Sequence, residues 1–377
     1  MNRARALTHY TPLRPWLIVL LACAVYLGVI FAANDADPLV FVTLGECFSA
    51  CVGADGTACP PDSEGYDGQF AYYIARDPAA SPDCLDAPAY RLQRILLPAL
   101  ARALSLGQAA LIPWALVAIN LAALAGGTAL LEDLLLRAGA SRWYALSYGL
   151  FAGVFMAVRL STAEPLAYGL ALAAVWLAAR ERLTWAAILL ALAALAKETT
   201  AFFALGIALH LALAGRRPAA LTLALIAAAP FLAWQGVLVA WQGAPGVGSG
   251  GALATRFTPI PYGGVWQIAF EGGLLVFLVL GVLLAIPAAV VPSLWGLWRA
   301  ARDLRGGQGD LAACLLLANA AIMPFVPFST YREFLGLLRF MPGLVIAVVW
   351  YAAAHRQRRA LRYSTLWIVL IAFVVAG

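Results

Sequence analysis

Charged residues are scarce in this sequence of 377 residues: they make up 12% of it, against 63% hydrophobic residues, and the mean hydropathy is +0.85. Soluble globular domains carry roughly 25% charged residues, so this composition excludes a soluble domain. Apolar runs near the ~20 residues that cross a bilayer recur along the chain. The sequence therefore predicts an all-α polytopic membrane protein, with a single membrane-embedded domain over residues 1–377.

Lysine and histidine are almost absent. Lys197 is the one lysine, so arginine supplies nearly all of the positive charge behind the net value of +6. Because the arginines follow the expected membrane orientation, they indicate no nucleic-acid partner. His9 and His355 are expected on the cytoplasmic side, and His210 toward the inner end of a span. A Ser-His-Asp hydrolase acting outside would therefore lack its base.

The apolar runs and the arginines together predict a topology. We expect about eleven spans, near residues 16–33, 108–135, 143–158, 162–179, 184–196, 198–214, 218–241, 272–297, 311–327, 334–354 and 364–377. Arg3, Arg5 and Arg14 precede the first span, which predicts a cytoplasmic N-terminus and an uncleaved anchor. This topology places 16 of the 25 basic residues on the cytoplasmic side, counting the N-terminal segment and the connections between spans that lie there.

Residues 34–107 form the one long hydrophilic stretch, and this topology places them outside. Four of the six cysteines lie there: Cys47, Cys51, Cys59 and Cys84. Their grouping predicts two disulfides in an oxidising compartment, with the connectivity open. Zinc is the competing interpretation, although the loop has no histidine. Cys23 and Cys314 lie in predicted spans and are expected to be free thiols.

Polar and aromatic side chains crowd residues 64–78 of this loop. Gly65 and Gly68 bracket Tyr66 and Asp67 and allow the backbone to turn sharply. A helix is expected to begin at Gln69 with a polar and aromatic face, and to end before residue 78, a proline. Asp67 is the candidate catalytic carboxylate, and an N-cap of this helix is its alternative role.

Lys197 and Glu198 lie midway along the apolar residues 184–214, which have arginines at both ends. A single helix would put one arginine cluster on the wrong side, so two helices are expected. The first has ~13 residues, or ~20 Å, too short for a ~30 Å bilayer core. Lys197 and Glu198 then lie below the outer surface, where ionisable groups are paired or functional. A purely structural pair between them is the alternative.

Arginines are also predicted near the outer surface. Asp86 as a cap and the proline at 88 are expected to start an amphipathic helix. This helix carries Arg91 and Arg94 one turn apart, and it is expected to lie on the membrane. The two arginines bind either lipid headgroups or a substrate phosphate, which suits the guanidinium fork. Arg332 is expected at an outer membrane end, with Arg339 two turns deeper on nearly the same face.

An arginine at the depth of Arg339 needs an anionic partner. A lipid-linked phosphate would enter at this depth, which makes Arg339 a candidate for the donor phosphate. Glu164, Glu198 or Glu271 on another helix is the alternative partner. The candidate substrate-binding residues are therefore Tyr66, Gln69, Arg91, Arg94, Lys197, Glu198, Arg332 and Arg339.

Three short motifs carry a resemblance to a known family. They are Tyr-Asp-Gly-Gln-Phe at 66–70, Ala-Arg-Asp-Pro at 75–78 and Tyr-Arg-Leu-Gln-Arg at 90–94, with Thr-Ala-Glu-Pro at 162–165 in the next outer connection. Together with the long first loop and the span count, they resemble the GT-C superfamily of membrane glycosyltransferases, in a bacterial branch linked to cell-surface glycopolymers.

The resemblance implies transfer of a sugar from a polyprenyl-phosphate carrier to a glycan or lipid acceptor, outside the bacterial cytoplasmic membrane. It matches Asp67 to the first-loop catalytic acid and Glu164 to the second-loop acid. The first loop lacks the adjacent acidic pair common in the family. No cofactor is therefore implied as required, and a divalent metal is left open.

Two other classes compete with a transferase. A transporter would also hold charges at membrane depth, and a non-catalytic assembly factor for polysaccharide would need no site. An enzyme should gather Asp67, Glu164 and several arginines around one outward cavity with a lipid-facing opening, whereas a pathway that continues to the cytoplasm would favour a transporter. A nucleotide-sugar donor is not expected, because the longest cytoplasmic connection, near 298–310, cannot house a nucleotide-binding domain.

Overall fold

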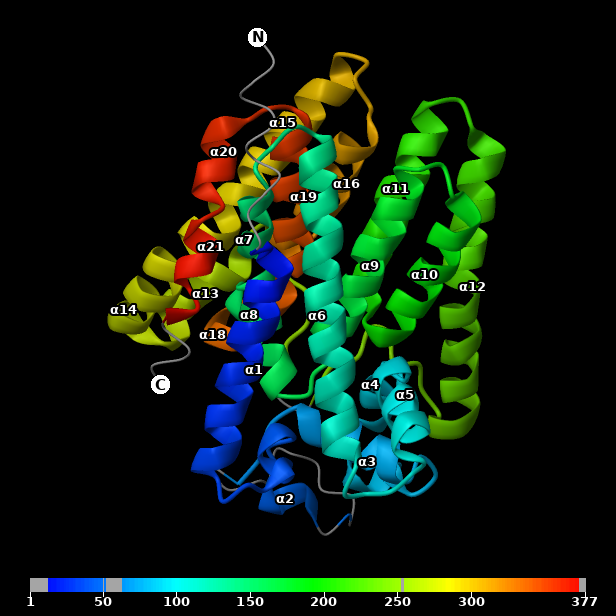
Figure 1. Cartoon of the computed structure of the whole chain (residues 1–377), viewed down its shortest axis with the longest axis vertical. Helices are drawn as coiled ribbons and strands as arrows, with labels where there is room; N and C mark the ends of the chain where they lie inside the picture. The colour runs from blue at the N-terminus through cyan, green and yellow to red at the C-terminus, as the bar shows by residue number, and fades with distance from the viewer. Residues whose placement is uncertain (1–12, 50, 52–62, 252–253, 373–377) are drawn as a thin grey trace.

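The computed structural model describes residues 13–49, 51, 63–251 and 254–372. All regular structure in these ranges is helical, which confirms the predicted all-α class. Figure 1 shows the long helices running side by side, with α2, α3 and α5 gathered at the lower end, which we call the loop end. The connections after α6, α11, α15 and α19 lie at the opposite end, which we call the arginine end.

Four helices of the described chain are long and apolar enough to cross a membrane. They are α1 (Pro15–Ala33), α6 (Ile112–Arg137), α12 (Arg217–Gln242) and the continuous helix Gly273–Arg305. The last joins α14 (Gly273–Val276), the π-helical η6 (Phe277–Val290) and α15 (Val291–Arg305). A fifth span results if α18 (Phe334–Phe340) and α19 (Pro342–Ala354), which meet at 49°, are one broken span.

The other predicted spans are shorter or broken helices. The predicted span 143–158 is divided among η4 (Arg142–Ala145), α7 (Leu146–Gly149) and α8 (Ala152–Arg159). The remaining elements are α9 (Glu164–Ala178), α10 (Leu183–Ala196), η5 (Glu198–Thr200), α11 (Ala201–Leu213), α13 (Gly263–Glu271), α16 (Leu311–Ala321), η7 (Met323–Phe325), α17 (Phe328–Arg332), α20 (Arg358–Tyr363) and α21 (Leu366–Val369). The structure thus shows a helical protein with membrane-spanning segments, and the count of eleven stays a prediction.

Helix α1 shows how the outside of the bundle suits lipid. Val19, Cys23 and Leu27, spaced by four residues, are buried against the neighbouring helices. On its other face Leu21 and Val25 are 57% and 66% exposed. Exposed apolar stripes of this kind are expected of a helix that faces acyl chains.

The loop end is built from six short helices. They are η2 (Pro38–Phe41), α2 (Glu46–Ser49), α3 (Gly68–Arg76), η3 (Ser81–Cys84), α4 (Pro88–Leu92) and α5 (Leu96–Ser105). The helix predicted near residue 69 is α3, and Gly65 has the positive φ of +67° that the predicted turn needs. The prediction of a single amphipathic helix from residue 86 is wrong, because the chain forms two helices there, α4 and α5.

One predicted disulfide is present, between Cys51 and Cys84. It joins the segment after α2 to the end of η3, across 33 residues. Cys59 lies outside the described residues, so the second predicted disulfide stays a prediction. Cys23 and Cys314 are buried free thiols, as predicted.

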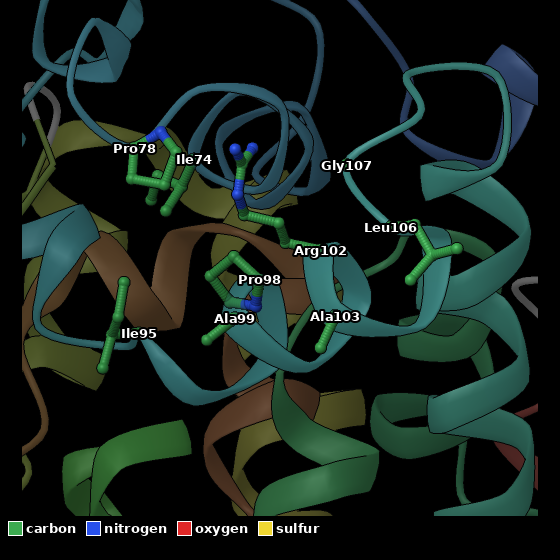
Figure 2. Close-up of a pocket in the computed structure, with 9 residues that line it drawn as sticks. All are labelled: Ile74, Pro78, Ile95, Pro98, Ala99, Arg102, Ala103, Leu106 and Gly107. Atoms are coloured by element: carbon green, nitrogen blue, oxygen red, sulfur yellow. The ribbon is translucent and has the colours of Figure 1, made fainter.

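An apolar groove of about 420 Å³ lies between α3 and α5 (Figure 2). Ile74, Ile95 and Pro98 line it, and Arg102 reaches past them to donate to the carbonyls of Ala75 and Arg76, at 2.9 and 2.6 Å. The guanidinium of Arg102 therefore ties α5 to the end of α3.

Candidate functional site

Eight charged side chains meet where α3, α4, α9, η5 and α18 come together. We call them the outer charge cluster: Asp67, Asp86, Arg91, Arg94, Glu164, Lys197, Glu198 and Arg339. They come from parts of the chain up to 272 residues apart. Seven of them were singled out in the sequence, and the structure brings those seven together.

Asp67 is held between two arginines. Its Oδ1 accepts from Nη1 of Arg91 at 2.9 Å, and its Oδ2 accepts from Nη1 of Arg339 at 2.7 Å. The side chain makes no capping hydrogen bond to α3, so a role as N-cap alone is wrong. Burial alone would raise the pKa of Asp67, but the charges of Arg91 and Arg339 outweigh it and hold that pKa far below its usual range. Asp67 is therefore a carboxylate at neutral pH.

Glu164, the first residue of α9, is buried deeper in the cluster. Its Oε1 accepts from Nζ of Lys197 at 2.6 Å and from Nε of Arg339 at 2.9 Å. Its side chain is 1% exposed and that of Lys197 is 7% exposed. Arg339 thus joins Glu164 to Asp67, which makes Glu164 one of the partners predicted for it.

Lys197 and Glu198 do not pair with each other in the structure. Lys197 turns to Glu164, whereas Glu198 accepts from Nε and Nη2 of Arg94, at 3.0 and 2.6 Å. The chain breaks at Lys197 between α10 and η5, as the sequence predicts. The extended backbone of Lys197 lets two adjacent residues reach different partners.

Arg91 and Arg94 point inward and do not extend toward lipid. Their side chains are 12% and 16% exposed, and each makes a two-point contact with a carboxylate. Arg91 also stacks over the ring of Phe70, 4.2 Å from its centroid. The structure therefore does not support a headgroup role for these two arginines.

The sequence did not single out Asp86 and Tyr90 as site residues. Asp86 accepts from Nε and Nη2 of Arg91 at 2.7 and 2.8 Å, whereas the sequence suggested only a helix cap. The hydroxyl of Tyr90 accepts from Nη2 of Arg94 at 2.8 Å, and its ring lies under the same guanidinium. The signal available was the Tyr-Arg-x-x-Arg spacing, which puts Tyr90 and Arg94 one turn apart.

Tyr66 extends the cluster toward the surface. Its hydroxyl accepts from Nη1 of Arg339 at 3.0 Å and donates to Oε1 of Glu333 at 3.0 Å. Burial raises the pKa of Tyr66 well above its usual range, so the hydroxyl stays protonated and can donate. Tyr66 thus contacts Arg339 beside Asp67, and its role in substrate binding stays a prediction.

Two predicted site residues lie outside the cluster. Gln69 is buried in the loop, where its side chain accepts from the amide of Gly45 at 2.9 Å and donates to the carbonyl of Glu64 at 2.6 Å. Arg332 is an exposed residue at the end of α17, with its guanidinium 5.7 Å from the ring centroid of Phe328. Gln69 thus fixes the turn before Asp67.

Glycines allow the close backbone approaches that assemble the cluster. A Cβ on Gly68 would collide with the carbonyl of Leu160, which lies at the end of α8. A Cβ on Gly153, within α8, would collide with the carbonyl of Leu338, next to Arg339. Helix α8 therefore packs closely on α18, and the residue that follows α8 contacts the start of α3, beside Asp67.

Metal ligands do not gather in the described part of the chain: no three His, Cys, Asp or Glu side chains come together as a metal-binding group there. Each acid of the outer charge cluster contacts a base. Comparisons with protein-family models, with curated proteins and with solved structures found no match for this chain.

Proposed function

We propose that the protein is a membrane glycosyltransferase of the GT-C type, which transfers a sugar from a polyprenyl-phosphate carrier to a glycan or lipid acceptor. The observation that carries the proposal is the convergence of Arg91 and Arg339 on the carboxylate of Asp67, with Glu164 on the same arginine. It combines two cations suited to a phosphate with two carboxylates suited to proton transfer and orientation.

The proposed setting is a bacterial cytoplasmic membrane, crossed by about eleven spans, with the N-terminus inside and the outer charge cluster outside. The placement of arginine supports it: Arg216 and Arg305 border connections at the arginine end of Figure 1, opposite α3. The lipid bilayer would hold the carrier's tail while its phosphate reaches the depth of Arg339.

In the proposed reaction the acceptor hydroxyl attacks the anomeric carbon of the donor sugar. Its proton passes to the carboxylate of Asp67, and the new glycosidic bond forms. The bond from the anomeric carbon to the phosphate oxygen breaks, and its electron pair stays on the leaving lipid phosphate. Arg91 and Arg339 stabilise that phosphate, and Glu164 keeps Arg339 oriented.

The gathering of charges favours this proposal over a non-catalytic assembly factor, for which scattered charges are expected. The outward cavity expected at the site of an enzyme stays a prediction. The buried Lys197 at a helix break is the one observation that favours a transporter, because broken helices hold substrate in several transporter folds. Movement of a sugar across sealed vesicles without chemical change would support that alternative.

The test is an assay of purified protein in detergent with a panel of polyprenyl-phosphate sugars, monitored for release of the free lipid phosphate. Asp67→Asn keeps the shape and should lower turnover by at least ~100-fold with an active donor. Asp133→Asn, at the exposed arginine end, is the matched control and should turn over like the parent. Folded Asp67→Asn protein with near-normal turnover would contradict the catalytic role.

Arg339→Lys tests phosphate binding. Lysine keeps the charge but loses the fork that contacts Glu164 and Asp67 together. Donor affinity should fall by ~10-fold or more, equal to about 1.4 kcal/mol. A variant that unfolds, but whose surviving folded fraction binds donor normally, would mark Arg339 as a structural link only.

A further inference from the structure

The outer charge cluster is balanced, which has a consequence for any anionic ligand. Its acids are Asp67, Asp86, Glu164 and Glu198, and its bases are Arg91, Arg94, Lys197 and Arg339. A phosphate that entered this cluster unchanged would be an excess negative charge in a mostly buried place, which is costly. One carboxylate must therefore withdraw from its arginines when a phosphate binds.

Asp67 is the acid that can withdraw most easily. Its side chain is 31% exposed, against 23% for Glu198, 7% for Asp86 and 1% for Glu164. Each arginine holds it through a single Nη1 atom, whereas Asp86 and Glu198 are each held at two points by one arginine. A phosphate with two free oxygens matches the two converging Nη1 atoms as the carboxylate does.

We propose that the carboxylate of Asp67 occupies the phosphate site of the resting protein, and that the donor's phosphate displaces it from Arg91 and Arg339. This inference rests on the proposed function for the identity of the phosphate as that of a polyprenyl-phosphate sugar. The site is thus closed by the chain's own carboxylate until the donor arrives.

The displacement also links donor binding to catalysis. While both arginines hold Asp67, its carboxylate is a poor base, because they stabilise its charged form. Once the phosphate takes over the two Nη1 atoms, the freed carboxylate can accept the proton of the acceptor hydroxyl. After transfer, Asp67 loses that proton to solvent and returns to Arg91 and Arg339, which expels the lipid phosphate.

The experiment measures the affinity of farnesyl monophosphate, a soluble stand-in for the carrier phosphate, by calorimetry in detergent. Asp67→Asn removes the competing charge but keeps the arginines, so affinity should rise at least ~10-fold over the parent protein. Glu333→Gln is the matched control. It removes one negative charge next to Tyr66 without freeing an arginine, so affinity should change by no more than about 2-fold.

Other results overturn the inference. Equal gains in Asp67→Asn and Glu333→Gln would show a general charge effect without displacement. Unchanged or weaker binding in Asp67→Asn, together with turnover by the parent protein, would reject the displacement and leave the glycosyltransferase proposal standing. Tighter binding in Asp67→Asn, with no donor turned over by the parent, would reject the reaction and keep the phosphate site.

A second variant keeps the test decisive if Asp67→Asn unfolds. Asp67→Ala leaves a gap of carboxylate size between Arg91 and Arg339. Added formate should fill that gap, stabilise the variant and compete with farnesyl monophosphate, while leaving the parent protein unaffected. Formate that competes equally with both proteins, or with neither, would contradict the proposal.

Discussion

The two ends of the bundle differ in how far their charge pairs reach along the chain, although the arginine end also buries Glu132 at 3.5 Å from Arg142. At the loop end, the outer charge cluster is mostly buried and joins parts of the chain up to 272 residues apart. At the arginine end, Asp133 pairs with Arg137 one turn away and with Arg180, and Arg216 pairs with Glu181. The side chains of Arg216 and Glu181 are 43% and 65% exposed.

The difference in exposure between the two ends shows which charge pairs could be removed with little loss of stability. Exposed pairs such as that of Arg216 with Glu181 contribute about 0–1 kcal/mol to stability. Buried ionisable groups near lipid cost stability unless every one has a partner. A chain with only 12% charged residues that nevertheless keeps eight together at one end is typical of a functional site.

The largest expected effect sharpens this contrast. Glu164→Gln removes the carboxylate that Lys197 and Arg339 share, which leaves a buried ammonium without its partner. We expect a loss of about 3–5 kcal/mol in the free energy of unfolding. Denaturation of the purified protein in detergent measures it, with Asp133→Asn as the exposed control at no more than about 1 kcal/mol.

A double variant separates the pair from the rest of the site. Glu164→Gln combined with Lys197→Met removes both charges and should recover most of the lost stability, because no lone ion is left. Equal losses in the single and double variants would mean that Glu164 stabilises the fold in some way other than by pairing with Lys197.

The next effect concerns the covalent link at the loop end. Cys51→Ser together with Cys84→Ser should cost about 2–4 kcal/mol, because the open loop gains freedom in the unfolded chain. Thermal unfolding of the variant and of the parent protein measures the loss. Reaction of the denatured, unreduced parent protein with a thiol reagent tests whether the disulfide forms. Labelling of Cys51 or Cys84 under these conditions would contradict the disulfide between them.

The sequence alone predicts the local features of the site well. The break at Lys197 follows from two adjacent ionisable residues in an apolar stretch flanked by arginines. The turn before Asp67 follows from Gly65, whose φ of +67° suits glycine. Both features depend on neighbours in the chain, so pattern and spacing are enough to find them.

The partners of these residues could not be read from the sequence. Nothing near Arg339 in the chain indicates that it meets Asp67, 272 residues away, and Glu164 at once. Gln69 was assigned to the substrate because it lies on a polar helical face, but the loop folds over that face and buries it. Asp86 resembles a cap because a helix-starting proline follows two residues later.

A smaller effect tests how the loop end reaches its tight geometry. Gly153→Ala forces a methyl group against the carbonyl of Leu338 and should cost about 1–3 kcal/mol while shifting Arg339. Gly126→Ala, on α6, is the matched control because nothing lies within 4 Å of its added Cβ. Unfolding measurements should show a loss for Gly153→Ala alone. Equal stability of the two variants would contradict the close packing of α8 on α18.

The smallest expected effect is that of pH on stability, and its sign follows from the pKa of Asp67. The pKa of this carboxyl lies far below its usual range in the folded protein, because the lowering of the pKa by Arg91 and Arg339 outweighs its raising by burial. Its stabilising contribution is therefore fully present above the unfolded pKa, ~3.9, and is lost only as the pH falls below that value toward the folded pKa. The difference in unfolding temperature between the parent and Asp67→Asn should thus stay constant from pH 8 to pH 5. If Arg91 and Arg339 did not hold the carboxylate, burial would raise its folded pKa, and the parent would instead gain stability relative to Asp67→Asn as the pH falls through this window.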